Sequence, residues 1–197
     1  MFIPIGDNVK IKRFPFVITF IILLNIFIFF KIRVDENLLF APFEIKRPDF
    51  FILFKMLLSM FLHSSIFHLF FNMLFLFVFG KSVEEKLGHI RFLFLYIIGG
   101  IFSSLFYILF NIESRIPIVG ASGAISAIMG SYFVYFFKKK ITTFSIIPPF
   151  KYQISSWIFF LIWIFTQFIN IKSPEIAVLA HLGGFIFGFI ASKAFDT

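Results

Sequence analysis

One serine of the chain is flanked by small residues and opens a long apolar run. This residue, Ser122, lies within residues 120–124, which read Gly-Ala-Ser-Gly-Ala. A histidine, His181, lies in the last apolar run, and a neutral imidazole can take a proton from a serine hydroxyl as a general base. Neither run holds a carboxylate beside these residues, since Glu175 precedes the last one. The two residues predict hydrolysis by a Ser–His dyad without an acidic third member.

An earlier apolar run carries side chains that can donate hydrogen bonds. His68 and Asn72 are four residues apart, so they share one face of a helix. The amide of Asn72 and one ring nitrogen of His68 can donate, and so can the backbone N–H of Ser122. These three donors are suited to an oxyanion hole, which stabilises the negative oxygen formed during acyl transfer.

A metal site is the main alternative for the histidines. His63, His68 and His181 are possible ligands, but His63 and His68 are five residues apart, unlike the i, i+4 spacing of H-E-x-x-H. No carboxylate accompanies them. We therefore predict neither a metal nor another cofactor.

Helix packing alone is an alternative explanation for the small residues. Ser122, Ser126 and Gly130 follow each other at intervals of four, as do Gly184 and Gly188 in the last run. Such spacing is typical of helices whose backbones lie very close together inside a membrane. The two interpretations are compatible, because close backbones would bring the serine near the last run.

The composition is that of an integral membrane protein. Of the 197 residues, 60% are hydrophobic and 37 are phenylalanine, and the mean hydropathy is +1.00, well above soluble domains. The absence of cysteine excludes thiol catalysis and disulfides. The net charge is +8, but Lys and Arg are scattered between apolar runs as membrane flanks, which predicts contact with the lipid bilayer and no nucleic-acid partner.

The apolar runs predict an all-α, multi-pass membrane protein with a single domain over residues 1–197. Membrane spans must be helical because lipid cannot satisfy open backbone groups. Residues 38–60 are expected to form an interfacial or re-entrant loop between the first two spans, because the apolar stretch there is too long for one helix. Six helices are predicted, at about 14–30, 61–79, 90–110, 121–137, 152–169 and 176–195.

The orientation follows from the basic residues. More of the Lys and Arg residues lie on the side of the N-terminus, which predicts that both termini are cytoplasmic. The second, fourth and sixth spans then run from outside to inside. The candidate polar residues lie early in these spans, so they share one depth in the outer half of the membrane and predict a site that opens to the extracytoplasmic side.

At this point the sequence resembles the rhomboid intramembrane serine proteases. The similarity is spread from the second span to the sixth, and the order of the motifs makes it specific. The motifs are His63-x4-His68-x3-Asn72, Gly80-x3-Glu84-x3-Gly88, Gly120-x-Ser122-Gly123 and Ala180-His181-x2-Gly184-x3-Gly188.

The resemblance implies a six-helix core with a membrane-embedded loop between helices 1 and 2. It implies Ser122 as the nucleophile, His181 as the general base, and His68, Asn72 and the Ser122 backbone N–H as the oxyanion hole. Substrates would be membrane proteins cleaved within a transmembrane helix near the outer boundary. The residues expected to serve the structure are the polar His63 and Glu84 and, for helix packing, Gly120, Gly123, Gly184 and Gly188.

The chain departs from the family pattern at two places that bear on the site. Many members have an aromatic residue four positions after the serine, stacked on the histidine, but this chain has Ser126 there. Something else must therefore orient the imidazole. In the loop, Phe54-Lys55 replaces a frequent Trp-Arg pair, so the planar fork of the arginine is lost.

Two other functions compete with proteolysis. The first is that of a catalytically inactive rhomboid-like protein that binds and escorts membrane proteins, although such relatives usually lack the serine or the histidine. The second is that of a six-span channel or transporter. The sequence shows no inverted repeat, no pair of broken helices and no intramembrane acid for ion coupling, which disfavours transport.

Overall fold

A computed structural model describes residues 2–32, 38–46, 50–145, 149–171 and 177–196. Most of them are helical. The predicted start of the last span at residue 176 and residues 47–49 of the predicted loop lie outside the described residues. In chain order the elements are β1 (Phe2–Asp7), α1 (Phe16–Lys31), η2 (Pro42–Lys46), α2 (Ile52–Ser59), α3 (Ile66–Leu87), α4 (His89–Asn111), α5 (Ser122–Phe136), β2 (Lys140–Ser145), β3 (Phe150–Ser155), α6 (Ser156–Ile169) and α7 (Val178–Phe195).

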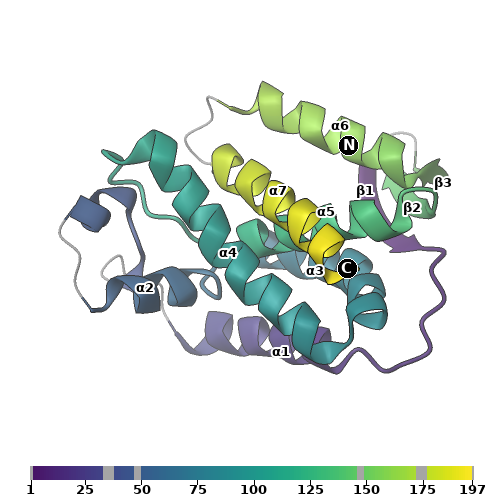
Figure 1. Ribbon diagram of the computed structural model, residues 1–197, viewed down its shortest axis with the longest axis horizontal. Helices are drawn as coiled ribbons and strands as arrows, with labels where there is room; N and C mark the ends of the chain where they lie inside the picture. Colours follow the sequence, from purple (N-terminus) through teal and green to yellow (C-terminus); the bar gives the residue numbers. More distant parts are fainter. Residues whose placement is uncertain (1, 33–37, 47–49, 146–148, 172–176, 197) are drawn as a thin grey trace.

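Helix α5 is the centre of the bundle and contacts α3, α4, α6 and α7 (Figure 1). Its closest neighbour is α7, and glycines make that approach possible. A Cβ atom on Gly184 would overlap the carbonyl oxygen of Gly123, and one on Gly188 would overlap that of Ala127. A Cβ on Gly130 would in turn overlap the carbonyl oxygen of Phe185. The small residues therefore bring the backbones of α5 and α7 into direct contact, as their spacing predicts.

The outer surface of the bundle is apolar. Large hydrophobic side chains point outward from α1, α4 and α6, for example Phe20, Leu109 and Phe165, which are 64%, 74% and 65% exposed. Such a surface suits lipid rather than water. Helices α3, α4 and α7 are long and apolar enough to cross a membrane, whereas the apolar helices α1, α5 and α6 are shorter.

Helix α3 begins and ends at recognisable signals. Ser65 caps its start, where the side chain accepts a hydrogen bond from the backbone N–H of His68 at 3.1 Å. Gly88 ends it with a positive φ of 78°, a conformation that favours glycine. The span was predicted to end at residue 79, so the helix continues eight residues further. Charged residues mark where the chain leaves the apolar layer, but they do not stop a helix whose Val83 and Glu84 are buried.

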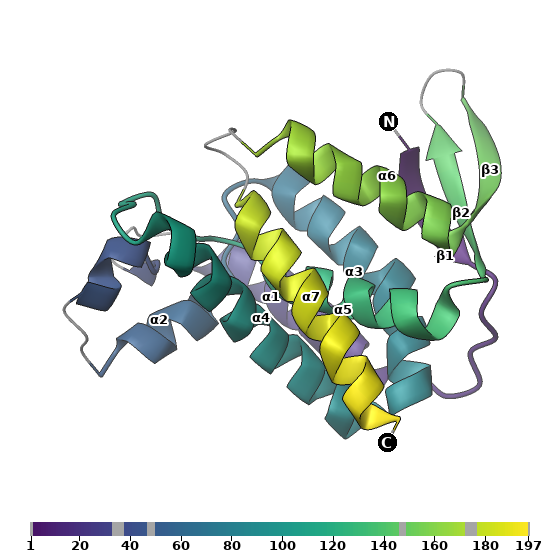
Figure 2. The ribbon, with the colours of Figure 1, turned by 45° about the horizontal axis from the view of Figure 1, so that its top comes forward.

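A small antiparallel sheet with the strand order β1-β2-β3 corrects the all-α fold prediction. The sheet lies at the opposite end of the molecule from α2 (Figure 2). Residues 152–155, predicted as the start of the fifth span, belong to β3, and α6 begins only at Ser156. Asp7 ties the sheet to the bundle, because its carboxylate accepts hydrogen bonds from the hydroxyls of Ser82 and Tyr132.

The segment between α1 and α3 forms the 3₁₀ helix η2 and the short helix α2, which packs on α4. The Ser59 hydroxyl accepts a hydrogen bond from the Phe40 backbone N–H at 3.0 Å, and the Ser59 carbonyl accepts one from the Gly120 N–H at 2.9 Å. Lys55 makes an ion pair with Glu44 at 2.6 Å, so α2 is also fastened to η2. Ser59 therefore connects this segment directly to the turn before Ser122.

Candidate active site

Ser122 and His181 are in hydrogen-bond contact. Ser122 is the first residue of α5, and His181 lies in the first turn of α7. The Nε2 atom of His181 is 2.9 Å from the Oγ atom of Ser122. The glycine-mediated packing of α5 on α7 brings the two side chains together although 59 positions separate them in the chain.

The second ring nitrogen of His181 also has a partner. Its Nδ1 atom is 2.9 Å from the Oε1 atom of Gln167, a buried residue near the end of α6. The Ser126 hydroxyl donates to the carbonyl oxygen of Ser122 at 2.8 Å, so it bonds within its own helix. Gln167 is not among the site residues that the sequence predicts. An amide side chain inside an apolar helix, where it can bond to a neighbouring helix, is the signal that could have found it.

The pair opens onto a cavity of about 800 Å³, which His68 and Asn72 also line. The Nδ1 atom of His68 is 3.1 Å from the hydroxyl of Ser64. The Nδ2 group of Asn72 is buried and has no hydrogen-bond partner within the part of the chain that the structure describes. The structure thus places an unused donor at the cavity, beside the turn that leads to Ser122.

Gly120 shapes that turn. Its φ is 105°, a left-handed conformation that other residues rarely adopt. A Cβ atom here would also press on the ring of His68 and on the Asn72 amide. Gly120 lies in the turn before α5, and its lack of a side chain lets the backbone pass close to the two donors of α3. Gly123 is the second residue of α5, and a Cβ atom on it would overlap the hydroxyl of Ser103 in α4.

The backbone N–H of Ser122 is a further donor at this position. Because Ser122 is the first residue of α5, its N–H belongs to the first turn, where helix N–H groups have no acceptor within the helix. The positive end of the helix dipole adds to the attraction for a negative oxygen. Ser122, Asn72 and His68 thus present donors along the wall of one cavity.

His63 lies in the loop just before α3. Its side chain is buried, and its ring meets the ring of His68 edge to face with the centroids 5.1 Å apart. Within the described residues, no group of three His, Cys, Asp or Glu side chains is arranged to hold a metal ion. His63 thus contacts the candidate site through its packing on His68.

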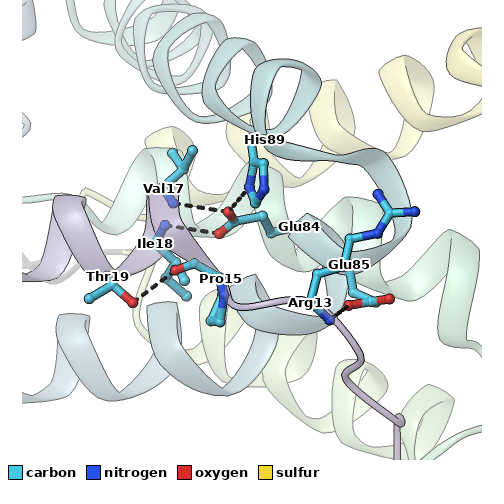
Figure 3. Close-up of polar contacts among 8 residues, drawn as sticks. All are labelled: Arg13, Pro15, Val17, Ile18, Thr19, Glu84, Glu85 and His89. Carbon is cyan, nitrogen blue, oxygen red and sulfur yellow. Dashed lines mark hydrogen bonds and ion pairs between the residues drawn. The ribbon is translucent and has the colours of Figure 1, made fainter.

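Glu84, which Figure 3 shows with its hydrogen-bond partners, lies at the other end of α3 from His68 and Asn72. Its carboxylate accepts hydrogen bonds from the backbone N–H groups of Val17 and Ile18, both at 2.9 Å. It also accepts one from Nδ1 of His89 at the start of α4. The side chain thus joins the beginnings of α1 and α4 to the end of α3, which is a structural contact.

Known proteins are similar in sequence to this chain. Residues 52–195 match the rhomboid domain family model. The chain is 36% identical over 155 residues to "Rhomboid protease AarA" of Providencia stuartii, a match that covers 70% of this chain and 54% of the relative. It is 31% identical over 135 residues to "RHOMBOID-like protein 6, mitochondrial" of Arabidopsis thaliana, covering 68% of this chain and 41% of the relative.

The chain belongs to the rhomboid family, as the resemblance predicted. The match spans only about half or less of the length of these relatives. The family contains inactive members as well as proteases. "Inactive RHOMBOID-like protein 8" of Arabidopsis thaliana is 32% identical over 140 residues, covering 68% of this chain and 36% of that protein.

Proposed function

We propose that the protein is an intramembrane serine endopeptidase that cleaves transmembrane helices. The observation that carries the proposal is the 2.9 Å contact between the Ser122 hydroxyl and the His181 imidazole, at a cavity lined by hydrogen-bond donors. A nucleophile, a base and donors for the developing oxyanion are the parts that acyl transfer requires.

In the first half of the reaction, Ser122 Oγ attacks the carbonyl carbon of the scissile peptide bond. His181 Nε2 takes the hydroxyl proton as the new C–O bond forms. The negative oxygen accepts hydrogen bonds from the Ser122 N–H and the Asn72 amide. When the C–N bond breaks, Nε2 returns the proton to the leaving amine, and the substrate is left as an ester of Ser122.

Water completes the reaction by the same route in reverse. It gives a proton to His181 Nε2 and attacks the ester carbon, and the serine leaves with that proton. His68 supports both halves if its Nε2 carries a hydrogen. The Ser64 hydroxyl favours this tautomer, because it can donate to Nδ1 and leave the hydrogen on Nε2.

The lengths of the helices support a site below the membrane surface. Helix α5 has 15 residues and is about 22 Å long, shorter than the roughly 30 Å hydrocarbon layer. With its C-terminus near the cytoplasmic face, its first residue, Ser122, lies within the outer half of the layer. Termini in the cytoplasm and an opening to the extracytoplasmic side follow from the basic residues. A substrate helix must unwind locally before its peptide bond can reach Ser122.

Cleavage in proteoliposomes tests the proposal. The purified protein is mixed with a model single-span substrate, and products are followed by gel electrophoresis and mass spectrometry. We expect cleavage that Ser122→Ala abolishes, with a loss of at least about 10⁴-fold. Ser131→Ala is the matched control, since Ser131 is buried in the same helix but bonds to Ser192. Full activity of Ser122→Ala would refute the nucleophile, and binding without cleavage by the parent would favour the inactive escort function.

A further inference from the structure

We propose that Gln167 is a positioning residue that holds the His181 imidazole in the orientation and tautomer needed for proton transfer from Ser122. The proposal rests on the function proposed above. It assigns to α6 a part of the site that none of the family motifs in the sequence contains. Gln167 acts through His181 and has no direct contact with the reacting atoms.

The direction of the Gln167 amide is fixed by its surroundings. Its Nε2 group is 3.4 Å from the carbonyl oxygen of Trp163 and 3.5 Å from the hydroxyl oxygen of Thr166. The Trp163 carbonyl only accepts, and the Thr166 hydroxyl, which donates its own hydrogen to that carbonyl at 2.6 Å, is left as an acceptor. The amide nitrogen therefore belongs on that side, and the oxygen faces His181. Turning the amide over would bring two oxygens together. The contact of 2.9 Å with His181 Nδ1 therefore involves the amide oxygen.

An amide oxygen only accepts hydrogen bonds, and this decides the tautomer of the ring. His181 Nδ1 must carry the hydrogen and donate it to Gln167. The other nitrogen, Nε2, is then unprotonated and points its lone pair at the Ser122 hydroxyl, 2.9 Å away. This is the form of the ring that can act as a base.

Gln167 can also provide the support for the imidazole that Ser126 does not give. With no aromatic residue at position 126, the ring needs another support, and the Ser126 hydroxyl is used within α5. Gln167 is buried near the end of α6, which packs on α7. The amide therefore bonds to the edge of the ring from a neighbouring helix, where an aromatic side chain would stack on its face.

The support is neutral, unlike the carboxylate of a Ser-His-Asp triad. The described residues that line the cavity include no Asp or Glu, and its other titratable side chains are His68 of α3 and Tyr107 of α4. A glutamine fixes the tautomer and the angle of the ring, but it stabilises the charged imidazolium less than an acid would. This difference gives the proposal a measurable signature.

Two variants of Gln167 separate positioning from structure. Gln167→Leu keeps the approximate volume but removes the acceptor, and we expect kcat to fall about 10- to 100-fold with little change in KM. Gln167→Glu restores an acceptor at the same place and should recover most of kcat. Its carboxylate should also move the acid limb of the kcat/KM profile to higher pH, because an anion favours the imidazolium.

A matched control separates the loss of this amide from the loss of any glutamine amide. Gln153→Leu makes the same change at the other glutamine, which is exposed on β3, and should match the parent. A kcat of Gln167→Leu equal to that of the parent would overturn the positioning role. So would a Gln167→Glu protein that is as slow as Gln167→Leu and has the parent's pH profile. Either result would leave the protease proposal intact. A parent that neither cleaves substrate nor reacts with a fluorophosphonate would overturn both.

Discussion

Two polar side chains on helix α3, Asn72 and Glu84, have opposite hydrogen-bonding environments. They are 12 residues apart, about 18 Å along the helix, and both are buried. The carboxylate of Glu84 accepts hydrogen bonds from two backbone N–H groups and from His89. The Nδ2 group of Asn72 has no acceptor among the described residues and borders the cavity at Ser122.

The contrast shows how one helix can serve stability at one end and chemistry at the other. Buried polar groups in proteins are nearly always hydrogen-bonded, and a bonded group contributes to stability. A donor left without an acceptor destabilises the resting protein, but it is ready to bind a charge that appears only during reaction. By this criterion we propose a structural role for the Glu84 end and a catalytic role for the Asn72 end.

Replacing Asn72 gives the largest effect expected from this comparison. Asn72→Ala should lower kcat by roughly 10²–10³-fold, because the oxyanion loses one donor. The midpoint of thermal unfolding in detergent should stay within a few degrees of the parent value, since the Asn72 Nδ2 group has no hydrogen-bond partner to lose among the described residues. Cleavage kinetics and a melting curve on one preparation measure both quantities. Nearly full activity with a large drop in the unfolding midpoint would reverse the roles of the two ends.

Replacing Glu84 should have the converse effect. Glu84→Gln puts an amide nitrogen where an acceptor is needed and should lower the free energy of unfolding by about 2 kcal/mol. For a chain of this size that corresponds to a drop of about 4–8 °C in the unfolding midpoint. Below that midpoint, kcat should change only a few-fold.

The neighbouring residue provides the control for Glu84. Glu85 is partly exposed and accepts hydrogen bonds from two backbone N–H groups, that of Lys12 and that of Arg13. Figure 3 shows the contact with Arg13. Glu85→Gln should therefore lower the midpoint less than Glu84→Gln does. Equal drops in the unfolding midpoint from the two substitutions would mean that the burial of Glu84 does not increase its contribution to stability.

The smallest effect is expected at Ser64. Ser64→Ala removes the donor to His68 Nδ1 and allows the ring to adopt the other tautomer, with no hydrogen on Nε2. We expect a loss of about two- to tenfold in kcat and no change in the unfolding midpoint, because Ser64 is exposed. The kcat and the unfolding midpoint of the variant, each measured in parallel with the parent, test this expectation. A loss as large as that of Asn72→Ala would mean that His68 is the principal donor.

The sequence was sufficient to propose the residues of the site because their types are unusual in lipid. Ser122, His181, His68 and Asn72 stand out from an apolar background, and the small residues at intervals of four predict the contact between α5 and α7. These signals are local in the chain. The family membership confirmed the fold at the level of a mostly helical rhomboid domain.

Other features depend on tertiary contacts that local patterns do not specify. Gln167 meets His181 because α6 packs on α7, a tertiary contact that the apolar pattern of either helix does not specify. The predicted fifth span takes in residues 152–155 of β3, although the alternation of apolar and polar residues in this strand is typical of a β-strand. Ser59 was missed because its two bonds join segments far apart in sequence.

Reaction with a fluorophosphonate tests the central claim most directly. The reagent modifies only a serine that a nearby base has activated, and it needs no knowledge of the natural substrate. Detergent-solubilised parent protein should gain one adduct, located on Ser122 by mass spectrometry of its peptides, while Ser122→Ala and His181→Ala should gain none. A parent that stays unmodified, or an adduct of equal yield in His181→Ala, would contradict a serine activated by His181.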